Sequence, residues 1–211
     1  MSHTEQLYTA VVEGNAALAK QLTEEMLNQK TDPQTIINTA LIPAMDEVGR
    51  LFECDEYYVP ELLISARAMK QSLNLINPLL AAKGSKPKGQ VVIGTVHGDL
   101  HDIGKNLVAS MLEGAGFSVI DLGVDVLPEK FVDSIQGDDI TILALSALLT
   151  TTTPAMKDTI NAIERAGKRN KVKIMVGGAP VTEKFAQEIG ADGYSASASG
   201  AVIVARSFVK V

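Results

Sequence analysis

The sequence predicts a helical bundle followed by an α/β domain built on a doubly wound parallel sheet. Up to about residue 80, apolar residues recur at the three- and four-residue spacing of amphipathic helices. After residue 90 the period changes, and short β-branched runs alternate with helical stretches, which is typical of a parallel sheet. Residues 82–90 contain two Gly, one Pro and three Lys and have linker composition. We therefore place the two domains at residues 1–84 and 85–211.

The composition limits the classes of function. Of the 211 residues 46% are hydrophobic, which is enough for a sizeable core. The net charge is −6, and no basic stripe with interleaved aromatic residues appears, so nucleic-acid binding is disfavoured. The chain has neither an apolar run of about 18 residues nor a signal-peptide pattern over residues 1–20, so no membrane role is expected. Since the single cysteine, Cys54, cannot form an internal disulfide, we expect a cytoplasmic protein.

Three or four helices are expected in the first domain. Apolar residues between 7 and 26 mark a first helical segment, in which Gly14 is a candidate break. Asp32 followed by Pro33 is a start signal for a second helix, which Pro43 is expected to bend. Apolar residues between 62 and 76 mark a third, and together these helices predict a small bundle.

Five alternating strand and helix units are expected in the second domain. Strands are predicted at 90–96, 117–121, 140–146 and 172–176, with a weak fifth at 193–196. Helices are predicted at 104–114, 128–136, 154–168, 182–189 and 200–209. The expected strand order is 2-1-3-4-5, as in flavodoxin-like (Rossmann-like) folds.

The most informative segment is the transition out of the first predicted strand. The buried run Val91 to Ile93 leads into Asp99-Leu100-His101-Asp102-Ile103-Gly104, where that strand ends and a helix begins. Ligands of open α/β sheets bind at this edge. One imidazole between carboxylates is a plausible single-ligand metal site there.

Polar and small residues also follow two other predicted strands. In the order 2-1-3-4-5, the first, third and fourth strands lie side by side. Their carboxyl ends carry His101, Ser146 and Gly177, so we expect these residues to converge on one edge of the sheet.

Three segments resemble the motifs of cobalamin-binding domains, which occur in methionine synthase, the coenzyme B12 mutases and the small corrinoid proteins of methyltransferase systems. The residues from Asp99 to Gly104 are similar to the family's Asp-x-His-x-x-Gly, Ser146-Ala147-Leu148 to its Ser-x-Leu, and Gly177-Gly178 to its Gly-Gly. The string from Gly98 to Asn106 resembles the methyltransferase branch rather than the mutase branch. Residues before about 85 resemble that branch's helical cap, so the resemblance covers nearly the whole chain.

The resemblance implies a site centred on His101 as the lower axial ligand of cobalt, the metal ligand of this protein. A corrin supplies four equatorial nitrogens, so one neutral imidazole suffices. Asp99 would accept a hydrogen bond from the other ring nitrogen, and Ser146 would extend this chain. Without the other motifs, His101 would be read as a capping or core histidine. The remaining implied cofactor-binding residues are Gly98, Asp102, Ile103, Gly104, Leu148, Thr150, Gly177 and Gly178, with Tyr58 and Val59 in the cap.

Several of these residues also have ordinary structural explanations. Asp102 stands where a helix N-cap is expected, and Gly98 and Gly104 can be turn glycines. The run from Thr150 to Pro154 can be a loop and a helix start. Tyr58 and Val59 precede a proline at a helix entrance and are as readily packing residues as cap residues.

The resemblance further implies a corrinoid methyl carrier that has no complete catalytic activity alone. It would bind cobalamin with the cofactor's own base displaced and His101 on the metal. Co(I) would take a methyl group from a substrate-specific methyltransferase, giving methylcobalamin, and a second methyltransferase would accept the methyl group. A reductive activation protein would restore oxidised cobalt. The alternatives are a corrinoid-binding sensor, which needs an output module, and a subunit of a B12-dependent mutase, which needs a radical-generating barrel from another chain.

Overall fold

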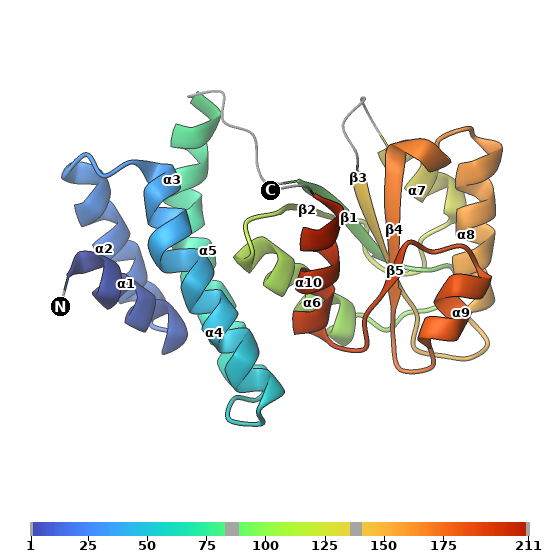
Figure 1. The fold of residues 1–211 in the computed structure, drawn as a ribbon, viewed down its shortest axis with the longest axis horizontal. Helices are drawn as coiled ribbons and strands as arrows, with labels where there is room; N and C mark the ends of the chain where they lie inside the picture. Colours follow the sequence, from blue (N-terminus) through green and yellow to red (C-terminus); the bar gives the residue numbers. More distant parts are fainter. Residues whose placement is uncertain (1, 83–88, 136–140, 210–211) are drawn as a thin grey trace. The chain divides into compact units, whose positions relative to one another are not determined.

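The computed structural model describes residues 2–82, 89–135 and 141–209 (Figure 1). Its contacts divide the chain into two compact units, Met1–Pro87 with Glu113–Gly116, and Lys88–Leu112 with Phe117–Val211. The predicted domain boundary after residue 84 lies outside the described residues.

The first unit is helical, as predicted. Its elements are α1 (His3–Val12), α2 (Ala16–Asn28), α3 (Pro33–Ile36), a π-helical turn (Ile37–Leu41), α4 (Ile42–Glu53) and α5 (Val59–Ala82). Gly14, at φ +72°, separates α1 from α2 as expected, because this left-handed backbone ends a helix. The Asp32 carboxylate caps α3 by accepting the Thr35 N–H at 3.1 Å. No described helix, including the long α5, has the length and apolar character needed to cross a membrane.

The helix expected from Asp32 onward contains a π-helical turn at Ile37–Leu41. There the Ile42 N–H bonds to the Ile37 carbonyl, five residues back. Pro43 follows directly and has no N–H to donate to Thr39. The π-helical turn thus lies just before Pro43, where an α-helix would lose the hydrogen bond to the Thr39 carbonyl.

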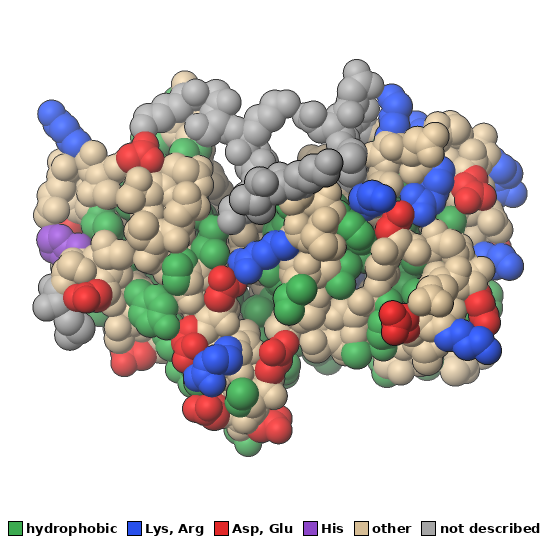
Figure 2. All heavy atoms as spheres, viewed as in Figure 1, with side chains coloured by type: hydrophobic (Ala, Val, Ile, Leu, Met, Phe, Trp, Pro, Cys, Tyr) green, Lys and Arg blue, Asp and Glu red, His purple; other side chains and the backbone are tan. Residues whose placement is uncertain are grey.

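The core of the helical unit includes a polar contact between α2 and α5. The buried hydroxyls of Thr23 and Ser72 lie 2.9 Å apart, and Thr23 also donates to the Ala19 carbonyl. Figure 2 shows acidic side chains gathered around the end of α4 and the turn that follows it. Arg50 of α4 forms ion pairs with Glu47 of the same helix and with Glu56 of the turn. The fully buried large apolar side chains of this unit are Leu7, Ile36, Leu41, Leu62, Met69 and Ile76.

The second unit alternates strands and helices. It contains β1 (Gln90–Thr95), α6 (Ile103–Gly114), β2 (Ser118–Asp121), α7 (Pro128–Ser134), β3 (Thr141–Ser146), α8 (Pro154–Arg165), a 3-10 turn (Arg169–Lys171), β4 (Val172–Gly177), α9 (Glu183–Glu188), β5 (Gly193–Tyr194) and α10 (Ala198–Phe208). The described strands are all parallel in the order β2-β1-β3-β4-β5, which confirms the predicted topology. In Figure 1, α6 and α10 cover one face of the sheet and α7, α8 and α9 the other.

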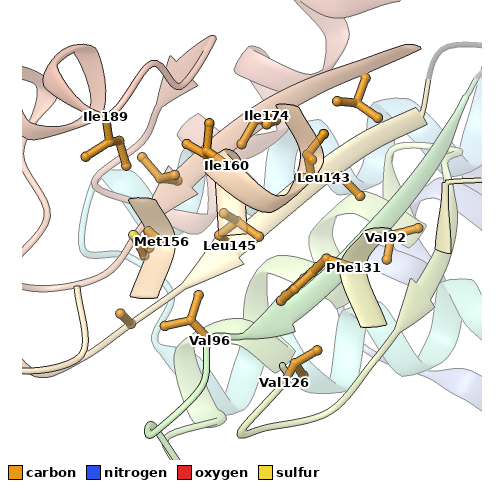
Figure 3. Packing of buried hydrophobic residues seen from close by; sticks show 14 of the residues in the cluster. Val92, Val96, Val126, Phe131, Leu143, Leu145, Met156, Ile160, Ile174 and Ile189 are labelled. Carbon is orange, nitrogen blue, oxygen red and sulfur yellow. The ribbon is translucent and has the colours of Figure 1, made fainter. Parts of the chain in front are cut away.

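The packing of the core beneath α7 and α8 explains why β1 has a glycine at position 94 (Figure 3). Phe131 of α7 is fully buried against β1 and β3, beside Val92 and Leu143. A Cβ at Gly94 would come within 2.8 Å of the Phe131 ring. Gly94 therefore lets this ring pack on β1, which is a requirement of the core.

Candidate functional site

The carboxyl ends of β1, β3 and β4 are in register. Thr95, Ser146 and Gly177 form the last paired row across these strands. The loops that follow carry the three motifs, so the structure brings them to one edge of the sheet. This is the edge at which open α/β sheets bind ligands.

The first loop places His101 against Asp99. The His101 Nδ1 lies 2.7 Å from the Asp99 Oδ1, and the His101 backbone N–H donates to the same oxygen at 3.0 Å. An ionised carboxylate only accepts hydrogen bonds, so the proton of the neutral ring is on Nδ1 and Nε2 keeps its lone pair. Asp99 is fully buried, whereas half of the His101 side chain is exposed. The exposed imidazole is thus oriented by a buried carboxylate, which makes His101 a candidate metal ligand.

The other oxygen of Asp99 is equally well satisfied. Its Oδ2 accepts the Thr152 hydroxyl at 2.6 Å and the Leu148 N–H at 2.8 Å. Burial alone would raise the pKa of this carboxyl, but the hydrogen bonds from the Thr152 hydroxyl and from the amides of His101 and Leu148 hold it well below its ordinary value. Asp99 is therefore a buried anion at neutral pH.

The hydroxyl beside Asp99 differs from the expected one. Ser146 was predicted in this position, but the bond comes from Thr152, and no described hydrogen bond joins Ser146 to Asp99. Ser146 is the last residue of β3 and gives its carbonyl to the Val96 N–H. The turn before α8 brings the Thr152 side chain close to the Asp99 carboxylate. In this turn the Thr152 N–H bonds to the Leu149 carbonyl. The threonine run before Pro154 was the available signal, but such a run is equally typical of a plain helix start.

Asp102 and Gly104 begin the helix after the loop. Asp102 occupies the position before α6, and its carbonyl accepts the Asn106 N–H at 2.8 Å. Its carboxylate contacts the Asn106 side-chain amide at 3.1 Å. A Cβ at Gly104 would meet nothing within 4 Å, while Gly98 has the left-handed φ of +84°. The fold thus explains Gly98 and leaves Gly104 free of a packing requirement.

The Gly177-Gly178 pair allows a close approach of backbones. A Cβ at Gly178 would lie 1.8 Å from the Ala147 carbonyl oxygen, and its φ is +137°. A Cβ at Gly177 would lie 3.0 Å from the Ser195 carbonyl oxygen. The absence of side chains at these two positions therefore lets the backbone after β3 and after β5 approach the end of β4 closely.

Large apolar side chains are exposed in the loops of the same edge. Leu100 is 72% exposed and Ile103 78%, although both directly flank the His101 segment. The other exposed apolar residues after β2 and β3 are Val124, Leu127, Leu148 and Leu149. Thr150 is exposed beside them, and Ser146 is half-buried. Such a group of exposed apolar side chains is typical of a ligand-binding surface.

The predicted cap residues lie in the helical unit, at the start of α5. Tyr58 is 63% exposed, and its N–H bonds to the Glu61 carboxylate at 3.0 Å. Val59 is the first residue of α5 and is also exposed. Both side chains are thus free of the core of their own unit.

The edge around His101 suits a corrinoid. The site offers one imidazole nitrogen with a fixed lone pair, and a corrin brings the other four nitrogens of a cobalt complex. Its macrocycle is largely apolar, which matches the exposed leucine and isoleucine side chains. The residues present therefore fit this cofactor, and fold and site together define a Rossmann-like protein with a candidate cofactor site at the carboxyl edge of its sheet.

The chain belongs to the B12-binding proteins. It matches the B12 binding domain family over residues 89–203 and a second family of the same description over residues 4–77. A trimethylamine corrinoid protein of Methanosarcina acetivorans is 42% identical over 200 residues, which span 94% of this chain and 93% of that protein. The predicted family and its corrinoid cofactor are thereby confirmed.

Solved structures of cobalamin-binding proteins are similar to this chain over nearly its whole length. A cobalamin-binding protein from Desulfitobacterium hafniense matches with a TM-score of 0.79 and 29% identity over all of both chains. A chain of the methanol:cobalamin methyltransferase complex from Methanosarcina barkeri matches with a TM-score of 0.85 and 29% identity, over 98% of this chain and 79% of that chain. The Rossmann-like fold class is confirmed by these likenesses.

Proposed function

We propose that this protein is a methyl carrier that binds its corrinoid through His101. The observation that carries the proposal is the His101–Asp99 pair, in which a buried carboxylate fixes the tautomer of a half-exposed imidazole. The relatives support the carrier role, since they include trimethylamine and dimethylamine corrinoid proteins. When bound, the corrinoid supplies a cobalt centre that accepts and releases a methyl group.

The residues around His101 control its affinity for a metal. Asp99 holds the Nδ1 proton, which strengthens Nε2 as a donor, and Thr152 supports the carboxylate. His101 would hold the corrinoid's metal through Nε2, while Asp99 keeps the Nδ1 proton in place and Thr152 supports the Asp99 carboxylate.

Residues at the ends of β3 and β4 would hold the displaced nucleotide tail of the corrinoid. Ser146 ends β3 and Leu148 and Thr150 follow it, while Gly177 ends β4 and Gly178 follows it. Half-buried Ser146 offers a hydroxyl with no described partner, and the glycines present backbone without side chains. In the helical unit, Tyr58 and Val59 are proposed as further cofactor-binding residues, because their exposed side chains could exclude water from the cofactor.

The proposed partners are a substrate-specific methyltransferase, a second methyltransferase that accepts the methyl group, and a reductive activation protein. A related chain occurs in a methanol:cobalamin methyltransferase complex, which supports the first of these. The exposed edge of the sheet and the exposed start of α5 give a carrier the access that successive partners need.

Cofactor retention and partner capture test the proposed function. The full chain is loaded with hydroxocobalamin and desalted, and we expect one corrin per chain by absorbance. The loaded protein then serves as bait in native lysate, with mass spectrometry as the readout. Recovery of a methyltransferase supports the carrier role, whereas loss of the corrin, or recovery of a transcription factor or kinase instead, contradicts it.

A further inference from the structure

A second His–Asp pair lies at the same edge of the sheet as His101 and Asp99. His97, four residues before His101, places its Nδ1 2.7 Å from the Oδ1 of Asp125. Asp125 lies in the loop between β2 and α7. The His97 side chain is 56% exposed, so this pair is not part of the core.

Asp125 holds the His101 loop at more than one point. The same Oδ1 that faces His97 also accepts the Gly98 N–H at 2.7 Å. The Asp125 backbone N–H donates to the Asp99 carbonyl at 2.9 Å. Both hydrogen bonds join two loops that follow neighbouring strands, β1 and β2.

The backbone conformation of Asp125 indicates that its contacts with the His101 loop hold it in place. Its φ is +52°, in the left-handed region that few residues other than Gly, Asn and Asp adopt. Such a conformation persists where the surrounding contacts fix it. Here those contacts are the bonds to His97, Gly98 and Asp99.

The other end of the His101 loop is held by the same β2–α7 connection. Lys105, in the first turn of α6, has a side chain that is 1% exposed and forms an ion pair with Asp121 at the end of β2. Asp121 also accepts the Gly123 N–H at 2.8 Å. Two aspartates of one connection thus contact the beginning of the His101 loop and the helix that follows it.

These contacts lead to the metal ligand through Asp99. The Asp99 backbone is fixed on both sides, since its N–H bonds to the Val96 carbonyl and its carbonyl accepts the Asp125 N–H. Its side chain in turn orients the His101 ring. A shift of Asp125 would therefore move the carboxylate that holds the imidazole.

We propose that Asp125 and His97 are positioning residues, which clamp the loop after β1 so that Asp99 presents His101 in one orientation. This inference rests on the proposed role of His101 and extends it to residues that need not touch the cofactor. The clamp is a property of the chain itself, so it operates in the protein without corrinoid as well.

The first test uses the protein without cofactor. Long-range ¹H–¹⁵N NMR reports which nitrogen of His101 carries the proton. Wild type is expected to show the Nδ1–H form. D125G, which suits the left-handed backbone but lacks the carboxylate, should show a mixture of tautomers, and D125N, which keeps an oxygen acceptor, should restore the wild-type spectrum. A wild-type tautomer in D125G overturns the proposal.

The second test uses the loaded full chain. The protein is labelled with ¹⁵N-histidine, so that the corrinoid's own base is not mistaken for the ligand, and in the Co(II) form we expect D125G and H97A to lose at least half of the electron paramagnetic resonance signal with two-line splitting. H97N, whose amide nitrogen takes the place of Nδ1, should retain it, as should the control D133N on the exposed face of α7. If D125G does not fold, H97A decides, because it removes only an exposed ring.

The outcomes separate the two proposals. Absence of the two-line splitting in wild type would contradict the role of His101 as ligand, and the NMR experiment would still decide on the clamp. Full splitting in wild type, D125G and H97A alike would leave His101 as ligand and overturn the clamp alone.

Discussion

At the scale of single residues, the site depends on a buried carboxylate, that of Asp99. Asp99 is stable there because both its oxygens accept hydrogen bonds, from His101 on one side and from Thr152 and Leu148 on the other. A buried anion that loses one such donor keeps a lone pair that neither water nor the protein hydrogen-bonds, and this destabilises the fold. The hydroxyl of Thr152 should therefore matter more than its small size suggests.

Replacing Thr152 with Val removes this hydroxyl at nearly constant volume. We expect the free energy of unfolding to fall by about 1.5–3 kcal/mol, the range for a hydrogen bond to a charged group. T152S should recover most of the loss. Urea unfolding of the protein without cofactor measures the effect, with S146A as the comparison. A larger loss in S146A than in T152V would show that the wrong hydroxyl has been assigned.

The depressed pKa of Asp99 predicts a pH dependence of stability. The folded-state pKa lies below the unfolded value of about 3.9, so the stabilisation is complete above about pH 5 and is lost progressively as the pH falls toward the folded pKa. The gap in unfolding free energy between wild type and D99N should therefore be largest near pH 7 and shrink toward pH 3. Urea unfolding across this range tests it. A gap that is independent of pH would contradict the assignment of Asp99 as a buried anion.

The resemblance to the Asp-x-His-x-x-Gly motif predicted the His101–Asp99 contact, which the structure shows. It did not predict Thr152, since its approach depends on how the turn from Leu149 folds back before α8. The clamp at Asp125 was equally hidden. It joins loops that follow different strands, and its left-handed backbone is not marked by a glycine.

At the scale of elements, the site is set by how closely the strand ends approach. The carbonyl of Ala147 occupies the space that a side chain at Gly178 would need. Gly104, in the first turn of α6, has no left-handed φ, and a Cβ added to it would have no neighbour within 4 Å. Backbone packing therefore requires glycine at position 178 but not at position 104.

Substitution of each glycine by alanine separates these requirements. G178A should destabilise the protein by at least about 2 kcal/mol, because it combines a backbone clash with an unfavourable φ. G104A should be neutral or stabilise by up to about 1 kcal/mol. Thermal and urea unfolding measure both. If G104A nevertheless retains less corrinoid after desalting, Gly104 serves the cofactor, whereas unchanged retention would assign it no such role.

The order of the strands and the placement of most helices followed from hydrophobic periodicity and from the rules for parallel βαβ units. The π-helical turn at Ile37–Leu41 did not, because over a single turn the apolar spacing of a π-helix cannot be distinguished from that of an α-helix. Only Pro43 indicated that something must change there. The short β5, with two residues, was similarly weak in the sequence, where it lacks a β-branched run.

At the scale of the whole molecule, both units carry segments of the B12-binding family, and both the sheet edge and the start of α5 carry exposed apolar residues. A ligand that binds only the folded chain stabilises it by mass action. Corrinoid binding should therefore be visible as a change in the stability of the full chain.

Hydroxocobalamin at about 100 times its dissociation constant should raise the free energy of unfolding by about 2.7 kcal/mol. Thermal unfolding of the full chain with and without the corrinoid measures the shift. H101A at the same corrinoid concentration should show a smaller shift because its affinity is lower. Equal shifts in both proteins would mean that the imidazole contributes nothing to corrinoid affinity.

The measurement that most directly tests the role of His101 is electron paramagnetic resonance of the Co(II) protein labelled with ¹⁵N-histidine. Nitrogen ligation predicts three-line splitting in the unlabelled protein, two-line splitting in the labelled protein, and loss of the protein-derived splitting in H101A. Spectra that do not change on labelling, or a two-line splitting that survives in labelled H101A, would contradict the account.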